Sequence, residues 1–419
     1  MRIALVAQHG SPLTPAVDPN ADAQAAALTP LAQALAGLGH RVTIYARKDS
    51  AGLPDSAILA RGVTVEHLSA GPAAPLTDSE LTAHVRDFGD KLAGRWSRNC
   101  PDIAHAYNWT SGLAALAAAR DLNVRVVQSF GTLGTLRATP PCGQPAGDEP
   151  DQRIRMETCI ARSAAAVVAD TSAQASRLIQ MGVSRRSVTV IPEGVDTARF
   201  CPDGPVADRT ERPRLLAVSP LTEGQGLETL VRMLPGVPEA ELVIAGGPPK
   251  SRLRRNAVYR NLRRLATCLG VQRRLVFTGE VRLPDLPALL RSADLLVSAA
   301  PHDTLGTMTI AAMACGTPAA VSAVGGNRDA VLDEVTGLLV PPGRPDLLAR
   351  RIRRLLATPM RLEGFGIAAA DRARARYPWD RIARETVAAY ERCLPAAEVV
   401  LAEIEDEPAV SPARELAMA

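Results

Sequence analysis

The sequence predicts an α/β protein built from two doubly wound domains, each with a parallel sheet. Short apolar runs alternate with helix-length segments along the chain, and this alternation produces parallel sheets with crossover helices. The series of strands stops and then restarts after a polar segment near the middle of the chain. The length of 419 residues also exceeds what one hydrophobic core normally holds.

Each expected strand is a run of β-branched or other apolar residues bounded by polar residues, glycine or proline. The first series comprises residues 2–7, 41–46, 63–68, 102–107, 124–130, 165–170 and 188–192. The second series comprises residues 214–219, 241–246, 274–279, 294–299, 318–324 and 337–340. Helices are expected between the strands, for example over residues 24–38 and 79–98.

The segment 200–213 is rich in Pro, Asp and Arg and is the expected linker between the domains. Residues 137–153 lack core-forming side chains, which predicts a surface loop. The expected parts are an N-terminal Rossmann-like domain (1–200), a C-terminal one (201–376), a last helix (377–394) and a flexible acidic tail (395–419). Two such sheets place their strand carboxyl ends, and any ligand, at the crevice between them.

Composition narrows the possible partners. A hydrophobic fraction of 47% with 22% charged residues is typical of a globular chain. The aromatic fraction of 3% argues against a stacking surface for single-stranded nucleic acid, and the net charge of +4 requires no polyanionic partner. No run of 18 apolar residues and no signal-like start are present, so a cytoplasmic location is expected.

No metal or resident cofactor is expected from the motifs. The seven cysteines have no two-residue spacing, the six histidines have no metal-ligand spacing, and no Walker loop or GxGxxG is present. Residues 250–264 carry seven positive charges, which indicates a solvated helix face or, at most, peripheral contact with an anionic membrane.

Several segments carry a family likeness that spans nearly the whole chain. The segments are AAMACGTPAAVSAVGGNRDAVLDEVTGLLVPPG (311–343), IPEGVDTARFCP (191–202) and GLETLVRMLPGVPEAELVIAGGP (226–248). They resemble glycosyltransferase family 4, in particular the actinobacterial type similar to sucrose-phosphate synthases and inositol-phosphate glycosyltransferases. The resemblance implies the GT-B fold, with two Rossmann-like domains across a cleft and a last helix that crosses back to the first domain. It also implies retaining, metal-independent transfer of a sugar from a nucleotide diphosphate sugar.

The pair of cations that usually holds the donor diphosphate is missing. The family places Arg and, five residues later, Lys after the first strand of the second domain. This chain has Pro220 and Gln225 there. A charge-assisted hydrogen bond contributes roughly 1.5–3 kcal/mol, so the loss of two weakens donor binding strongly. Three nearby arginines could substitute or could only solvate a helix face; they are Arg252, Arg254 and Arg255.

Two carboxylates that the family directs at the donor are also altered. The resemblance implies that Asp303 takes the position near the sugar and is a candidate catalytic residue, whereas Ala311 replaces the ribose-binding glutamate. The backbone amides of Gly306, Thr307 and Met308, at an expected helix start, could receive an anion or sugar hydroxyls. They could equally belong to an ordinary helix N-terminus.

The remaining candidates come from strand ends and from the first-domain loop. Gln24 alone persists from the family's Gly-Gly-Gln turn, and Gly246 ends the strand 241–246 as a further candidate donor contact. The usual cleft histidine is replaced by Gly131. His105, a candidate catalytic residue, and His9 remain near strand ends, where a histidine is more often structural.

The sequence therefore leaves three hypotheses for function. The favoured one is a pseudo-glycosyltransferase that binds a nucleotide sugar, a glycan, a catalytically intact homologue or another protein with little or no turnover. The second is an active glycosyltransferase with a rewired donor site. The third is a transferase for a donor that lacks the full diphosphate. The favoured hypothesis rests on the joint loss of the cations, the ribose carboxylate, the glycine turn and the histidine.

Overall fold

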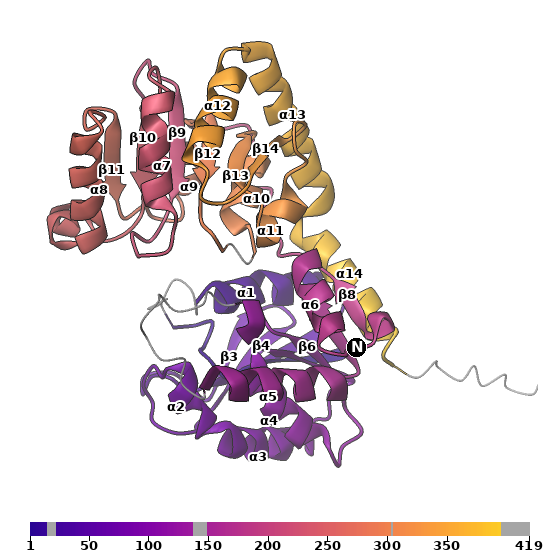
Figure 1. Ribbon diagram of the computed structural model, residues 1–419. Helices are drawn as coiled ribbons and strands as arrows, with labels where there is room; N and C mark the ends of the chain where they lie inside the picture. The colour runs from indigo at the N-terminus through magenta and orange to yellow at the C-terminus, as the bar shows by residue number, and fades with distance from the viewer. Residues whose placement is uncertain (15–21, 137–148, 303–304, 395–419) are drawn as a thin grey trace, which may run out of the picture.

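The computed structural model describes residues 1–14, 22–136, 149–302 and 305–394. Figure 1 shows two lobes stacked one above the other, each with a central sheet covered by helices. Asp303, the tail and most of the expected loop 137–153 lie outside the described residues, although residues 149–153 already belong to a helix. No helix within the described ranges is long and apolar enough to cross a membrane.

An eight-stranded sheet forms the first lobe, with strand order β3-β4-β2-β1-β5-β6-β7-β8. All seven strands expected from the sequence are present, and all neighbours among them pair in parallel. The strands are β1 (Arg2–Ala7), β2 (Arg41–Arg47), β3 (Ser56–Ala60), β4 (Val63–Leu68), β5 (Ile103–Tyr107), β6 (Arg125–Ser129), β7 (Ala166–Ala169) and β8 (Val188–Val190).

The sequence pattern did not predict β3, which pairs antiparallel with β4 at the edge of the sheet. Ile58 in the middle of this strand is 84% exposed. Because an edge strand packs few side chains into the core, it has a weaker apolar pattern than the buried strands.

The helices of the first lobe cover both faces of its sheet (Figure 1). They are α1 (Asp22–Gly37), α2 (Asp78–Thr82), α3 (Val85–Trp96), α4 (Trp109–Ala119), α5 (Glu149–Ser163) and α6 (Ser172–Gln180), with 3-10 turns η1 (Gly134–Leu136) and η2 (Arg185–Ser187). The single helix expected over 79–98 is instead divided into α2 and α3. The division falls at Ala83–His84, where the His84 ring lies against Gly71.

A six-stranded parallel sheet forms the second lobe, in the order β11-β10-β9-β12-β13-β14. Every strand expected in this half is present. The strands are β9 (Arg214–Val218), β10 (Glu241–Ala245), β11 (Leu275–Gly279), β12 (Leu295–Ser298), β13 (Ala319–Ser322) and β14 (Gly337–Val340). The helices are α7 (Leu227–Met233), η3 (Leu234–Gly236), η4 (Lys250–Arg255), α8 (Ala257–Cys268), α9 (Leu286–Arg291), α10 (Thr307–Ala314), α11 (Gly325–Ala330), α12 (Pro345–Leu356) and α13 (Pro359–Arg376).

The last helix, α14 (Trp379–Glu391), returns to the first lobe and packs against α1. Its buried residues Ile382, Ala383 and Tyr390 belong to the same core cluster as β1 and β2. The return begins where the amide of Val195 donates a hydrogen bond of 2.8 Å to the carbonyl of Tyr377. Residues 195 and 377 therefore lie together where the chain passes between the lobes.

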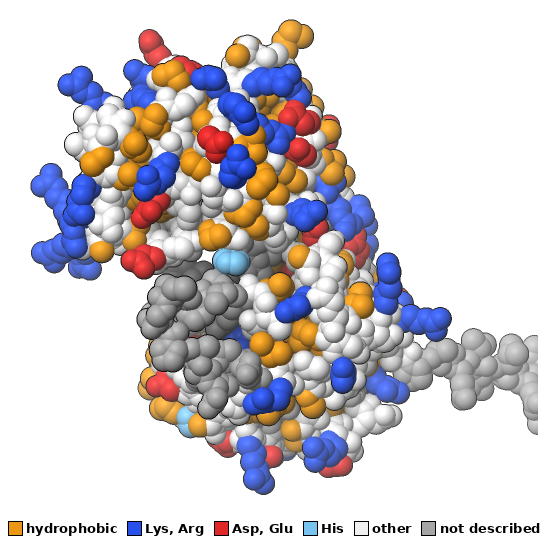
Figure 2. Space-filling view, in the orientation of Figure 1, with side chains coloured by type: hydrophobic (Ala, Val, Ile, Leu, Met, Phe, Trp, Pro, Cys, Tyr) orange, Lys and Arg blue, Asp and Glu red, His pale blue; other side chains and the backbone are white. Residues whose placement is uncertain are grey.

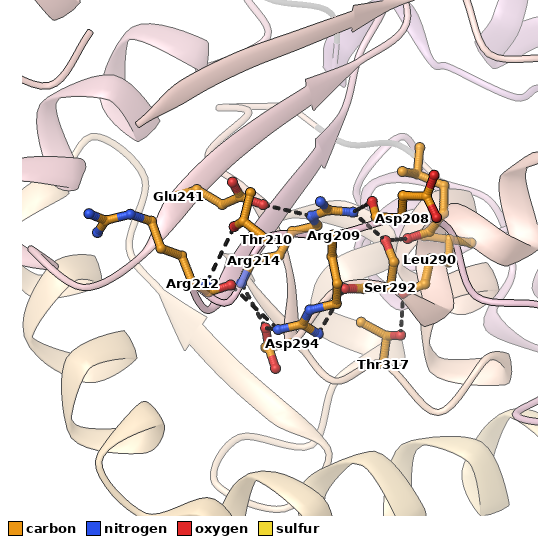
Figure 3. Close-up of polar contacts among 11 residues, drawn as sticks. Asp208, Arg209, Thr210, Arg212, Arg214, Glu241, Leu290, Ser292, Asp294 and Thr317 are labelled. Carbon is orange, nitrogen blue, oxygen red and sulfur yellow. Dashed lines mark hydrogen bonds and ion pairs between the residues drawn. The ribbon is translucent and has the colours of Figure 1, made fainter. Parts of the chain in front are cut away.

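The linker ends on a buried ion pair at the amino edge of the second sheet (Figure 3). Arg214 Nε donates to Glu241 Oε1 at 2.9 Å, and both side chains are less than a tenth exposed. Arg214 also donates to the carbonyl of Asp208 and to the hydroxyl of Ser292, each at 2.9 Å. The guanidinium thus joins the linker, β10 and the turn after α9.

A second carboxylate completes this polar cluster. Asp294 Oδ2 accepts a hydrogen bond from the backbone amide of Arg214 and another from the guanidinium of Arg209, both at 2.7 Å. Because Arg209 lies in the linker and Asp294 directly precedes β12, the cluster fixes the linker against the start of the sheet.

We expect Arg214→Met to lower the free energy of unfolding by about 3–5 kcal/mol, because it leaves Glu241 buried without its partner. Urea unfolding followed by circular dichroism measures this loss. The control is Arg344→Met, which removes an exposed ion pair with Asp346 and should leave the unfolding midpoint almost unchanged. Equal losses in the two variants would contradict the assignment.

Candidate functional site

The strand order of the first sheet reverses between β1 and β5, where doubly wound proteins bind ligands. Asn108 follows β5 and has φ 70° and ψ 158°, a backbone conformation that is rare outside glycine. Its Oδ1 accepts from the amide of Trp109 at 2.7 Å, and its Nδ2 donates to His9 Nε2 at 2.9 Å. His9 and Asn108 therefore lie side by side at this position, and the backbone of Asn108 is strained.

The second sheet reverses its order between β9 and β12. The loop after β9 runs from Ser219 to Gly226, and it borders a cavity of about 420 Å³. Gln225, one of the two positions of the family's cation pair, lines this cavity. The only charged side chains among its described lining residues are Glu223 and Glu228. The charge of this cavity wall is therefore opposite to what a diphosphate requires.

Glycines hold the loops of the second sheet close to one another. A Cβ on Gly226 would lie 2.0 Å from the carbonyl oxygen of Ala299, and one on Gly246 would lie 2.3 Å from that of Ser219. Both glycines also have positive φ. The backbone of Gly246, a predicted donor contact, therefore packs directly on the backbone of Ser219. Its amide donates a hydrogen bond of 2.9 Å to the carbonyl of Gly279.

The predicted helix start is confirmed, because α10 begins at Thr307 with Gly306 as its N-cap. The Thr307 hydroxyl donates to Glu193 Oε2 at 2.5 Å, which connects the second lobe to the segment after β8. Met308 is half-buried against a core cluster of the second lobe. Ala311 is 2% exposed within that cluster, so a glutamate at this position would bury a charge in the core.

Gln24 lies in the first turn of α1, which extends from Asp22 to Gly37. The backbone of residues 22–24, at the position that the resemblance assigned to a Gly-Gly-Gln turn, is therefore helical. Donor binding by Gln24 stays a prediction.

His105 is buried in a polar network beneath the cleft. Its Nδ1 lies 2.8 Å from the Tyr390 hydroxyl and 3.2 Å from that of Tyr107, and its Nε2 lies 3.0 Å from Ser129 Oγ. Because the Ser129 hydroxyl donates to the Val168 carbonyl, His105 donates from Nε2 and accepts at Nδ1. Burial lowers the pKa of His105 to about 3. These contacts support a structural role, in which the neutral ring ties α14 to the first sheet.

Two carboxyl groups that the sequence reading did not single out lie beside this network. Asp170 directly follows β7 and Glu193 follows β8, and both line a small cavity between the lobes. Burial, and then the charge of Glu193, raise the pKa of Asp170 to about 7. A search for acidic residues at the carboxyl ends of predicted strands would have found Asp170, since ligand-binding residues of α/β sheets gather there.

The lobes also touch at the start of α6. The amide of Ser172 donates to Asp329 Oδ2 of α11 at 2.6 Å. Together with the Thr307–Glu193 hydrogen bond, this contact connects the second lobe to the segments that follow β7 and β8. No group of three or more His, Cys, Asp or Glu side chains in the described part of the chain could hold a metal ion.

Two Rossmann-like lobes, with ligand positions at the facing carboxyl edges of their sheets, define the GT-B class of glycosyltransferases. Residues 23–194 match the family described as "Glycosyl transferase 4-like domain", and residues 212–358 match "Glycosyl transferases group 1". A D-inositol 3-phosphate glycosyltransferase from Jonesia denitrificans is 30% identical over 95% of this chain and 97% of the relative. One from Streptomyces bingchenggensis is 32% identical over 93% and 89%. The chain therefore belongs to the family 4, or group 1, glycosyltransferases.

Solved structures share the fold. Sucrose-phosphate synthase from Thermosynechococcus elongatus superimposes with a TM-score of 0.80 at 27% identity, over 93% of this chain and 98% of that one. Anabaena HepE in complex with UDP superimposes with a TM-score of 0.70 at 17% identity, over 94% and 100%. The resemblance and the GT-B fold expected from the sequence are thus confirmed.

We expect Asp170→Asn to stabilise the protein at pH 8 and to have little effect at pH 4. The raised pKa means that the folded state keeps the proton of Asp170 between about pH 4 and pH 7, whereas the unfolded state loses it. The stability due to the protonated carboxyl is therefore lost as pH rises through this window. Asparagine removes that loss, a gain on the order of 1–3 kcal/mol at pH 8.

Thermal unfolding from pH 4 to pH 8 measures this difference. The exposed Asp90 gives a matched control, Asp90→Asn, which should follow the wild-type pH profile. A gain from Asp170→Asn that does not change with pH would show that packing, and not charge, is responsible.

Proposed function

We propose that this family member is a pseudo-glycosyltransferase, which binds a sugar-containing ligand in its cleft and transfers sugar from nucleotide diphosphate sugars weakly or not at all. One observation carries the proposal. The cavity beside the reversal of the second sheet has only Glu223 and Glu228 as charged side chains among its described lining residues. A diphosphate that enters a cleft must exchange water for fixed positive donors, and this wall offers negative charge instead.

Electrostatic stabilisation of the leaving group supports the same conclusion for turnover. Negative charge grows on the nucleotide diphosphate as the sugar departs, so missing cations cost at least as much in the transition state as in binding. Pro220, at the other position of the cation pair, also lacks an amide hydrogen to donate. The expected ligand is therefore a nucleotide sugar held weakly or a glycan, and the expected partner is a catalytically intact homologue or another protein.

An active enzyme with a rewired donor site is the second candidate, and the basic segment after β10 favours it. Lys250, Arg252, Arg254 and Arg255 are exposed in η4. This turn follows the Gly246–Gly247 loop, and α8, which begins after it, contributes Val258 to the cavity. Figure 2 shows Lys and Arg side chains gathered over this end of the second lobe. Loss of measurable transfer in Arg252→Ala with Arg255→Ala would support this candidate.

We expect Pro220→Arg combined with Gln225→Lys to bind UDP or GDP at least tenfold more tightly than the wild type, about 1.4 kcal/mol. The change restores both cations in a loop whose backbone is held by glycine packing. Isothermal titration calorimetry of the full chain measures the affinities. Ala311 is left unchanged because it is buried.

The matched control adds the same charge elsewhere. Ser97→Arg with Asn99→Lys changes two exposed residues before β5, at the opposite edge of the first sheet, and should not improve binding. Sub-millimolar donor affinity together with measurable sugar transfer by the wild type would overturn the pseudoenzyme proposal.

A further inference from the structure

A pocket of about 310 Å³ lies at the amino ends of three neighbouring strands of the first sheet, β1, β2 and β4. We refer to it as the amino-edge pocket. Its lining includes Arg2, Arg41, Thr43, Tyr45 and Thr64. The cleft lies at the carboxyl ends of these strands, so the pocket is at the opposite edge of the sheet. It shares no described lining residue with the cavity beside β9 or with the small cavity between the lobes.

The register of the sheet places these five side chains on one face. Arg2 pairs with Arg41, and Thr43 pairs with Thr64. Tyr45 lies two positions after Thr43 in β2. Paired residues of parallel strands, and residues two positions apart in one strand, point to the same side. The five side chains therefore form a polar strip across three adjacent strands.

This polar strip interrupts a sheet that is otherwise apolar. Strands of a doubly wound parallel sheet are covered on both faces and are usually apolar on both. The opposite face follows this rule, because Val42, Ile44 and Val63 are buried in the same core cluster as residues of α1. On the pocket face, α3 ends at Trp96, which packs edge-on against Tyr45 with ring centroids 6.3 Å apart. The amino ends of β2 and β4 lie beyond this contact, and the residues there that face the pocket are polar.

The polar groups of the pocket have no partners within the described chain. Arg41, Thr43, Tyr45 and Thr64 make no side-chain hydrogen bond or ion pair with any residue that the structure describes. Tyr45 is 3% exposed, and the two threonines are half-buried. Polar groups that are largely removed from water are usually hydrogen-bonded in native proteins. A ligand that supplies the missing partners would therefore be bound favourably.

The charge of the pocket suits a ligand with a single negative charge. Arg2 is already paired with Asp102, because its guanidinium lies 3.3 Å from Oδ1 and its amide donates to Oδ2 at 2.7 Å. Arg41 has no such partner, and the described residues that line the pocket include no Asp or Glu. A second anionic group on the ligand would be repelled by Asp102. Multiply charged compounds such as diphosphates are therefore disfavoured.

We propose that the amino-edge pocket binds a sugar acid, a polyhydroxylated compound with one carboxylate. The carboxylate accepts paired hydrogen bonds from the guanidinium of Arg41. The hydroxyl groups of the ligand bond to those of Thr43, Thr64 and Tyr45, each of which donates and accepts. Burial raises the pKa of Tyr45 to about 12, so its hydroxyl keeps the proton that it donates.

The combination of groups selects this class of ligand. A simple aliphatic carboxylate would leave the three hydroxyls of the pocket without partners, and a neutral sugar would leave the charge of Arg41 without one. A volume of about 310 Å³ accommodates a sugar acid of six carbons. The inference goes beyond the proposed function, since the pocket lies away from the cleft and does not depend on binding of a nucleotide donor.

The probe for this pocket is sodium D-gluconate, compared with D-sorbitol, which carries a hydroxyl in place of the carboxylate. Sodium hexanoate, which has the carboxylate and no hydroxyls, is the second comparison. Isothermal titration calorimetry of the full chain at constant ionic strength should show gluconate binding with a dissociation constant on the order of 1 mM. Sorbitol and hexanoate should each bind at least tenfold more weakly. Equal binding of either compound, or no binding of gluconate, would overturn the proposal.

Arg41→Gln should abolish the preference for gluconate over sorbitol, because the carboxylate loses its partner. The control is Arg86→Gln, which lowers the net charge by the same amount at an exposed position near the start of α3. This control should keep the preference. If Arg41→Gln kept it as well, the carboxylate would be bound elsewhere and the assignment would be wrong.

The hydroxyl contacts are tested by Thr43→Val combined with Thr64→Val. Valine keeps the β-branched shape of threonine and its suitability for a strand, and only the hydroxyl is lost. Gluconate should bind at least tenfold more weakly to this variant, while its thermal unfolding midpoint should be no lower than that of the wild type. Unchanged gluconate binding in the folded variant would refute the role of the strand hydroxyls, and with it the proposal.

Discussion

Close backbone packing at the carboxyl edge of the second sheet is the constraint on which the cleft depends. Gly226 lies against the carbonyl of Ala299 and Gly246 against that of Ser219, at distances that no Cβ could share. Gly306 and Gly326 make a similar contact between the starts of α10 and α11. These contacts involve main-chain atoms, so the loops keep their positions whichever side chains stand at 220, 225 or 311. The fold can therefore persist while the charge of the donor site changes.

Among the described residues, hydrogen bonds of side chains and backbone and the helix α14 connect the two lobes. Thr307 reaches Glu193, Ser172 reaches Asp329, and α14 is held to the first sheet by the hydrogen bond between Tyr390 and His105. His105 therefore helps to hold α14 on the first lobe. The neutral ring is the stable form here, because a buried imidazolium without a counter-charge would cost free energy. The carboxyl groups of Asp170 and Glu193 line the same small cavity as His105.

The charged side chains of the described residues are distributed unevenly around the cleft. The cavity beside β9 exists and has a substantial volume, yet its described charged lining is acidic. The carboxyl groups of Asp170 and Glu193 line the small cavity between the lobes. The basic residues of η4, in contrast, are exposed on the outer part of the second lobe (Figure 2).

The sequence by itself determined the two-sheet architecture and thirteen of the fourteen strands in the described part of the chain, because buried strands are local patterns. It missed the edge strand β3, whose Ile58 faces solvent, and it treated 79–98 as one helix. Only the tertiary structure decided that His105 bonds Tyr390, 285 positions away in the chain, that Ala311 is buried, and that Asp170 lies beside Glu193. Each of these depends on which distant segments the fold brings together, and no local pattern encodes that.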